Sequence, residues 1–189
     1  MHKLFAHLNT INHHKWLVMK LCFRCGYYRQ GLVHDLSKYA PVEFFTGVRY
    51  YQGDRSPNAK DRECNGYSAA WLHHKGRNRH HWEYWTELTK GQCVPIKMPV
   101  RYVIEMWCDR IAATMVYEKE RYTDQSALNY FLRNYDNVII HQDTKDLLEI
   151  LLRHCADNGL DSTIVFIKNQ VKSKGYEIIK LKENENETL

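Results

Sequence analysis

The segment Gly31–Lys38 holds the residues whose types and spacing are best suited to chemistry. His34 and Asp35 are adjacent there, and the side chains around them are mostly apolar. A carboxylate in an apolar setting is costly unless a positive charge compensates it, and a metal ion does so strongly. Lys38 follows His34 by one helical turn, so we expect its ammonium at the mouth of the same site. The alternative is a capped, hydrogen-bonded core pair, so a metal site here requires ligands from other segments.

A first additional ligand is expected from the N-terminal segment. Residues 3–28 are predicted to form one amphipathic helix, because apolar residues recur at spacings of three and four without an intervening proline. His14 lies on the apolar stripe and His13 does not. The alternative for His14 is a core histidine bonded to a backbone carbonyl. Cys22 and Cys25 share the stripe, and without a second cysteine pair nearby they are interpreted as packing thiols.

Four histidines lie within nine residues, as two pairs at 73–74 and 80–81 that a Gly-Arg-Asn break separates. We expect one helix to end near Lys75 and another to start near Asn78 or Arg79, with Asn78 as its cap and the second histidine pair in its first turn. A basic RNA-binding patch is the alternative. Such patches rely on Arg and Lys more than on His, so a nucleic-acid partner is not expected.

Asp109 lies in the middle of the most apolar predicted helix, residues 100–121. Apolar residues cover most of the circumference of that helix, which is typical of a buried central helix. A lone aspartate there needs a partner, and Arg110 points about 100° away from it around the helix. Ala112 and Ala113 leave room for another helix or an ion, so Asp109 joins the candidate ligands.

The composition fits a single all-α domain. The 189 residues suffice for one core, and no apolar run approaches the ~20 residues of a membrane span. The six cysteines are scattered and no signal peptide is recognised, so we expect a cytoplasmic protein with reduced thiols. The net charge of +5 is spread out and favours anionic substrates. We predict one helical domain over residues 1–175 and a polar tail over 176–189.

The remaining segments are predicted more simply. We expect a short helix at His34-Asp35, another over 42–51, and three amphipathic helices over 124–135, 144–157 and 161–172. Residues 52–66 and the stretch from Gly91 to Pro99 are expected to be loops, the first with the length of a lid. His141 and His154 are expected to be structural or exposed.

The order His, His-Asp, paired histidines and Asp resembles the HD superfamily, which comprises all-helical metal-dependent phosphohydrolases. The wider pattern of His-Asp-Leu-Ser-Lys, a following Glu, His-x-x-x-Asn-x-His-His and Glu-Tyr-Trp is similar to an uncharacterised family of bacterial and phage proteins, over most of residues 8–120. The segment after the last histidine pair lacks the glycine-rich motif of cyclic-dinucleotide phosphodiesterases. The resemblance implies an HD-type helical bundle with one metal on His14, His34, Asp35 and Asp109, and a second on His74, His80 or His81, with Asp35 bridging. His74 is preferred to His73 because it stands four residues before Asn78, as in the family pattern.

Ligands of this kind, without thiolate, suit one or two ions of Mn, Fe, Ni, Co or Zn. The first hypothesis is a hydrolase of phosphate esters, acting on a nucleotide or a related small phosphorylated compound. Asp35 and Lys38 would be catalytic, and Lys38, Lys75 and Arg79 would neutralise substrate charge. Two alternatives stay open: a di-iron oxygenase on an HD-type fold, and a non-catalytic sensor of metal and nucleotide.

Overall fold

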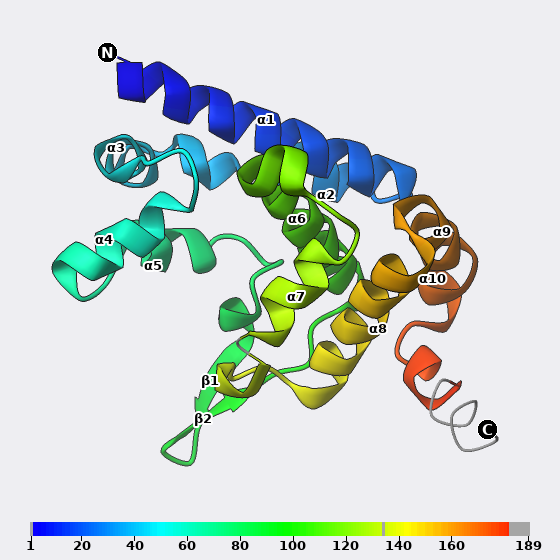
Figure 1. Ribbon diagram of the computed structural model, residues 1–189. Helices are drawn as coiled ribbons and strands as arrows, with labels where there is room; N and C mark the ends of the chain where they lie inside the picture. The colour runs from blue at the N-terminus through cyan, green and yellow to red at the C-terminus, as the bar shows by residue number, and fades with distance from the viewer. Residues whose placement is uncertain (1, 134, 182–189) are drawn as a thin grey trace.

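The structure is a computed structural model that describes residues 2–133 and 135–181, and it is mostly helical (Figure 1). The all-α class predicted from the sequence is confirmed, with one small two-stranded sheet added. In chain order the elements are α1 (His2–Arg24), α2 (Tyr28–Val33), the 3₁₀ helix η1 (Leu36–Tyr39), α3 (Pro41–Tyr50), α4 (Pro57–Asn65), α5 (Ala69–Lys75), the 3₁₀ helix η2 (Trp82–Trp85), β1 (Thr86–Thr89), β2 (Gln92–Pro95), α6 (Val100–Glu118), the 3₁₀ helix η3 (Lys119–Arg121), α7 (Ser126–Leu132), the 3₁₀ helix η4 (Tyr135–Asn137), α8 (Gln142–Asn158), α9 (Leu160–Phe166), the π-helix η5 (Ile167–Val171) and α10 (Lys172–Lys174). No helix in the described part of the chain combines the length and hydropathy of a membrane span.

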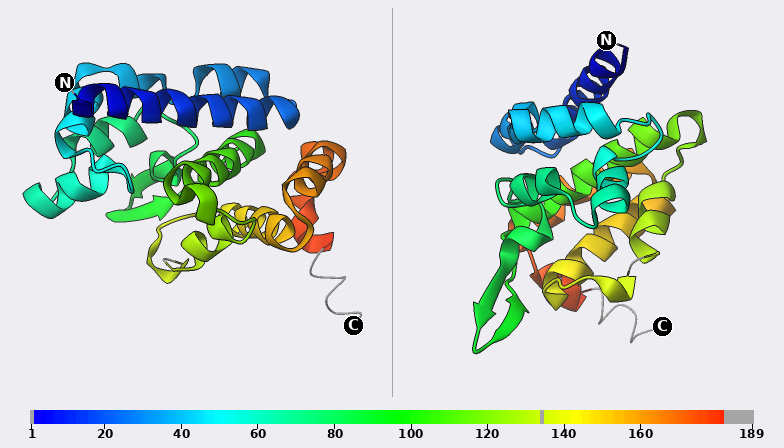
Figure 2. Two further views of the ribbon diagram at one scale, coloured as in Figure 1. Left: turned by 45° about the horizontal axis from the view of Figure 1, so that its top comes forward. Right: turned by 90° about the vertical axis from the view of Figure 1, so that its left-hand side faces the viewer.

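Helix α6 is the central element, as its nearly continuous apolar surface predicts. Ile104, Trp107 and Ile111 are fully buried on it, and burial of each such side chain contributes roughly 1.5–3 kcal/mol. Helix α1 packs along α6 on one side, and α7 and α8 pack on another (Figures 1 and 2). This packing fixes α1 relative to α6, and the two helices carry His14 and Asp109.

The C-terminal helices complete the core. Helix α8 buries four leucines at helical spacing, namely Leu147, Leu148, Leu151 and Leu152. The three predicted amphipathic helices are present: α7 is shorter than predicted, α8 is longer, and the third is divided into α9, η5 and α10. Residues 177–181 are also helical, and Ile178 is 2% exposed in the core, so the packed domain extends past residue 175, where the polar tail was predicted to start. The rest of the predicted tail, residues 182–189, lies outside the described residues.

Two segments that were predicted as loops contain regular secondary structure. Residues 57–65 form α4, which starts at Pro57 and ends before Gly66 at φ 79°. Its periodicity is weak because Asp61 is its only buried residue. Strands β1 and β2 form a hairpin that extends from the helical body (Figure 2). Lys90 and Gly91 connect them with φ values of 52° and 76°, and two consecutive positive φ values are typical of a tight hairpin turn.

Two predicted helix positions are wrong in a way that matters for the site. The His34-Asp35 dipeptide lies in the turn between α2 and η1, and residues 80–81 lie in a turn before η2. Asn78 does not cap a helix. Its side-chain amide donates back to the His74 carbonyl at 2.8 Å. His34, Asp35, His80 and His81 therefore lie in turns and not on helix faces.

Candidate metal centre

Side chains from separate segments converge on Asp35. Histidines of α1 and α5, the turn residues and an aspartate of α6 form two overlapping groups, and within each group the potential ligand atoms lie within 4.8 Å of one another. The first group is His14, His34, Asp35 and Asp109, and the second group is Asp35, His74, His80 and His81. The prediction that the four residues of the first group converge within the reach of one ion is confirmed.

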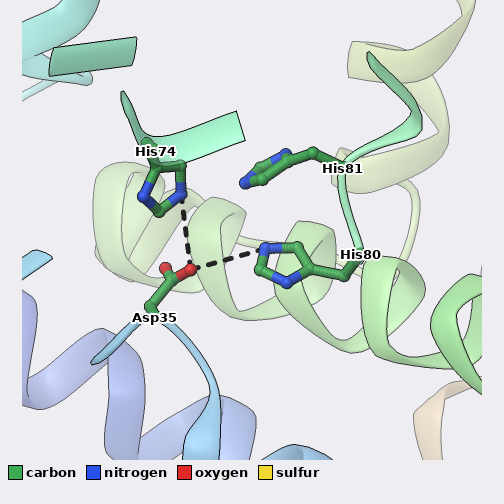
Figure 3. Close-up of side chains that lie close together, drawn as sticks. All are labelled: Asp35, His74, His80 and His81. Carbon is green, nitrogen blue, oxygen red and sulfur yellow. Dashed lines mark ion pairs between the residues drawn. The ribbon is translucent and has the colours of Figure 1, made fainter. Parts of the chain in front are cut away.

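The two oxygens of Asp35 face different groups. Asp35 Oδ2 lies 3.3 Å from His34 Nε2 and 3.8 Å from His14 Nε2. Asp35 Oδ1 lies 3.3 Å from His74 Nε2 and 3.4 Å from His80 Nε2. Figure 3 marks these two contacts with dashed lines. This is the arrangement that a carboxylate needs to bridge two metal ions.

Asp109 completes the first group from the opposite side. Its Oδ1 lies 2.9 Å from His14 Nε2 and 3.5 Å from His34 Nε2. Burial opposes the charged carboxylate, but the hydrogen bonds from these histidines outweigh it and hold the pKa of Asp109 well below its usual value. The lone aspartate of the central helix thus has its partners on α1 and in the turn after α2.

The backbone at Asp35 adopts a conformation that few residues tolerate. Its φ of 54° and ψ of 26° lie in the left-handed region, which Asp and Asn enter more readily than most residues. Lys15 Nζ donates to the carbonyls of Leu32 and His34 at 3.0 and 2.7 Å, which ties the turn to α1. A non-glycine residue in the left-handed region lowers the stability of the fold by roughly 1–3 kcal/mol, and such residues cluster at functional sites. The hydrogen bonds from Lys15 hold this turn in a conformation in which the Asp35 carboxylate faces the histidines.

Several polar atoms of the second group lack hydrogen-bond partners. Within the described residues, the Nε2 atoms of His80 and His81 and the Oδ1 atom of Asp35 are buried without a hydrogen bond. Each such group costs about 1–3 kcal/mol when it is left unsatisfied. A cation bound to imidazole nitrogens and carboxylate oxygens would satisfy them together, so the donor set fits one or two metal ions.

Two glutamates lie behind the histidines. Glu105 Oε1 accepts from Nδ1 of His34 at 3.0 Å and from Nδ1 of His80 at 3.2 Å. Glu43 accepts from Nδ1 of His74 at 2.7 Å and from Nδ1 of His73 at 2.5 Å. Such bonds fix the tautomer that leaves Nε2 free and orient the ring, as in metal sites. The sequence interpretation gave neither glutamate a role, although Glu105 precedes Asp109 by one helical turn and shares its face.

The structure distinguishes His74 from His73 and places both His80 and His81 beside Asp35. His74 is buried and its Nε2 faces Asp35, whereas the His73 ring bonds to Glu43. Both His80 and His81 belong to the second group, so neither replaces the other. Asn78 Nδ2 also donates to Ser37 Oγ at 2.7 Å, which connects the end of α5 to the turn that holds Asp35.

Burial and neighbouring charge set the protonation of the centre. Burial and the Lys38 ammonium lower the pKa of His14, and burial lowers that of His81 well below its usual value. For His34, burial is outweighed by the adjacent Asp35 carboxylate, which raises its pKa. Neutral His14 and His81 have the protonation state that metal ligation requires.

A family of unknown function, DUF5662, matches residues 3–154. The chain belongs to this family. The matched segment contains both groups of candidate ligands, as well as Glu43 and Glu105. No curated protein and no solved structure matched the chain.

In this DUF5662 chain the centre borders a cavity of about 720 Å³. His14, Asp35, His74, His81 and Asp109 are among the residues that line the cavity. Lys38 also lines it, with Nζ 2.5 Å from Asp35 Oδ2. Lys38 reaches Asp35 through the 3₁₀ turn of η1, and not along a helix that contains His34 as predicted.

The cations around the cavity differ from the predicted ones. Lys75 and Arg79 do not belong to its lining, and Arg79 Nη1 donates instead to Tyr102 Oη at 3.4 Å. Four arginines that were not among the predicted substrate-binding residues line it, namely Arg55, Arg62, Arg110 and Arg121. They come from the segment around α4 and from α6 and η3, which meet only in the folded chain.

Proposed function

We propose that this chain is a metal-dependent hydrolase of phosphate esters with a binuclear centre. The observation that carries the proposal is the position of Asp35, which presents one oxygen to each of two ligand groups beside a cavity lined with cations. The resemblance of the ligand order to the HD superfamily supports the same reaction class. We infer divalent ions of the Mn, Fe, Co, Ni or Zn type, because all the ligands are imidazole or carboxylate groups.

Two ions held in this way would lower the pKa of bound water and bind phosphoryl oxygens. The protein's own part is to fix the ligands and to supply charge around the substrate. Asp35 would hold the two halves of the centre at a set separation. Glu43 and Glu105 would keep the histidine rings oriented.

Lys38 is the cation best placed to act on the substrate. Its ammonium lies at the centre and also lines the cavity, and the Asp35 carboxylate overcomes the effect of burial and raises its pKa, so it stays charged. A fixed ammonium beside a phosphate stabilises the negative charge that builds up in the transition state. The cavity would accept a small phosphorylated compound such as a nucleotide.

The test combines metal analysis of protein purified without chelators with a screen of generic phosphoesters and nucleotides. Lys38→Ala should keep its metal and lose turnover by about a hundredfold, which corresponds to roughly 3 kcal/mol of transition-state stabilisation. Lys38→Arg should recover only part of the rate, since a guanidinium does not reproduce a point contact. Lys168→Ala, an exposed lysine of η5, is the matched control and should behave as wild type.

Other outcomes would change the proposal. Wild-type turnover by Lys38→Ala would remove the proposed role of the lysine. Bound iron together with consumption of dioxygen and no phosphoester hydrolysis would favour the oxygenase. Bound metal without any turnover would favour the sensor.

A further inference from the structure

The N-terminal helices form a layer on one side of the molecule, drawn in blue in Figure 2. On α1, Phe5, Asn12, Trp16 and Phe23 recur at spacings of seven and four, so they lie on one stripe of the helix. This stripe is opposite the residues that α1 buries. Phe5 and Trp16 are 64% and 48% exposed, so the outer side of the layer presents large apolar side chains to the surroundings.

Helix α2 and the 3₁₀ helix η1 extend the same surface. Tyr28 of α2 packs edge-on against Phe23, with the ring centroids 5.2 Å apart. Tyr39 of η1 donates from Oη to Asn12 Oδ1 at 2.7 Å. Both tyrosines therefore lie along the stripe of α1, and one turn from each tyrosine there is an exposed leucine. We call these exposed residues the apolar face, namely Phe5, Trp16, Tyr28, Leu32, Leu36 and Tyr39.

The segment that builds the apolar face is basic. The first 50 residues contain seven lysines or arginines and two acids, so their net charge of +5 equals that of the whole chain. The two acids, Asp35 and Glu43, are both buried. Lys20 and Arg29 are exposed, and Lys20 Nζ lies 4.1 Å from the centroid of the Trp16 ring. Among residues 2–50, the surface around the apolar face thus has cations and no exposed carboxylate.

This charge distribution decides which surface can cover the apolar face. A second copy in a two-fold contact would place the same basic surface on both partners, so like charges would repel. A bilayer with anionic head groups fits both features. Trp and Tyr side chains favour the level of the head groups, and aliphatic side chains favour the acyl chains beneath them. Exposed lysines and arginines are attracted to the anionic lipid surface.

We propose that the apolar face binds peripherally to an anionic lipid bilayer. Its aromatic side chains lie at the level of the head groups, its two leucines reach toward the acyl chains, and Lys20 and Arg29 face the lipid phosphates. The turn that carries Asp35 connects Leu32 to Leu36, so the bound surface adjoins the metal centre. The inference rests on this surface and not on the proposed function.

The test measures sedimentation of the 189-residue chain with vesicles. One vesicle preparation contains equal parts of phosphatidylglycerol and phosphatidylcholine, and the other contains phosphatidylcholine alone. Binding to the anionic vesicles should be at least about tenfold tighter, and added salt should reduce the difference. The tryptophan emission should shift to shorter wavelength on binding. Trp16→Phe should remove the shift and keep the binding, which would identify α1 as the bound surface.

Variants of exposed residues test the assignment directly. Phe5→Ser and Leu32→Ser should each weaken binding about tenfold, because an apolar side chain no longer enters the bilayer. Leu88→Ser on β1, where the leucine is 76% exposed, is the matched control and should bind as wild type. Arg29→Gln should weaken binding about fivefold, the effect expected of one cation at an anionic surface. Lys168→Gln, at an exposed lysine of η5, is its matched control.

Each outcome supports or overturns the inference whether or not phosphoesters are hydrolysed. Weaker binding in Phe5→Ser and Leu32→Ser, with wild-type circular dichroism, supports it. Absence of binding to anionic vesicles overturns it, and so does binding that these two variants leave unchanged or that Leu88→Ser weakens equally. A lipid-free dimer that Leu32→Ser dissociates would assign the apolar face to a second copy. Binding of polyglutamate that Arg29→Gln weakens, without vesicle binding, would indicate an acidic protein partner. Both of these results also overturn the proposal.

Discussion

The two ligand groups that share Asp35 are built on different kinds of structure. The first group takes His14 from α1 and Asp109 from α6, helices of 23 and 19 residues that pack along each other. The second group takes His74 from α5, a helix of 7 residues, and its other two histidines from the turn at 80–81. Core packing positions the first group, whereas hydrogen bonds position much of the second.

The hydrogen bonds around the second group show how a short segment is fixed. Ser37, Glu43 and Asn78 surround His74, and Glu105 bonds to His80. Ligands held by packed helices stay in place when single contacts are removed, and ligands held by polar contacts depend on each of them. We therefore expect the first group to bind its ion more tightly and the second group to lose its ion first on dilution or chelation.

Removal of the shared residue should have the largest effect. Asp35→Ala should lose both ions and lower the melting temperature, because the remaining buried groups each cost about 1–3 kcal/mol when unpaired. Asp35→Asn tolerates the same left-handed backbone and separates ligand loss from strain in the turn. Metal content by elemental analysis and thermal unfolding measure the two effects.

Asp161→Ala is the control for that experiment, since its side chain is 87% exposed and far along the chain from the centre. Full metal content and an unchanged melting temperature in Asp35→Ala would make Asp35 a turn residue without a ligand role.

Removal of one histidine from each group should separate the two halves. His14→Ala should lose the ion of the first group, and His81→Ala should lose that of the second, so each variant should keep about one ion per chain. Titration with a chelator, followed by elemental analysis, measures the occupancy. If either variant lost both ions at once, the two groups would form one cooperative site, and the difference between them would not hold.

The glutamates behind the histidines should give the smallest effects and the sharpest comparison. Loss of such a partner lowers metal affinity by roughly 10- to 100-fold. Glu43→Gln should weaken only the second group, whereas Glu105→Gln should weaken both, because Glu105 bonds to His34 and to His80. Metal dissociation constants from competition with a chromophoric chelator test this, and equal effects of the two variants on both ions would contradict it.

The sequence was most informative where helical periodicity decides which way a side chain points. His14 on the apolar stripe of α1 and Asp109 in α6 were placed inward by spacing alone, and the structure brings them within 2.9 Å of each other. The segment 52–66 and the hairpin were predicted poorly, because α4 has one buried residue and β1 has none. Without an apolar pattern, only turn chemistry at Lys90-Gly91 signalled the strands.

The sequence by itself thus determined the helical class and most of the candidate ligands, since these depend on residue type and local spacing. Only the tertiary structure showed that Asp35 presents a separate oxygen to each group, that Glu43 and Glu105 orient the rings, and that the cavity takes its cations from Lys38 and four arginines and not from Lys75 or Arg79. These features depend on the left-handed turn at Asp35 and on contacts between residues far apart in the chain, such as His14 and Asp109, which are 95 residues apart. Periodicity reports which face of an element is buried, and the folded packing decides which buried faces meet.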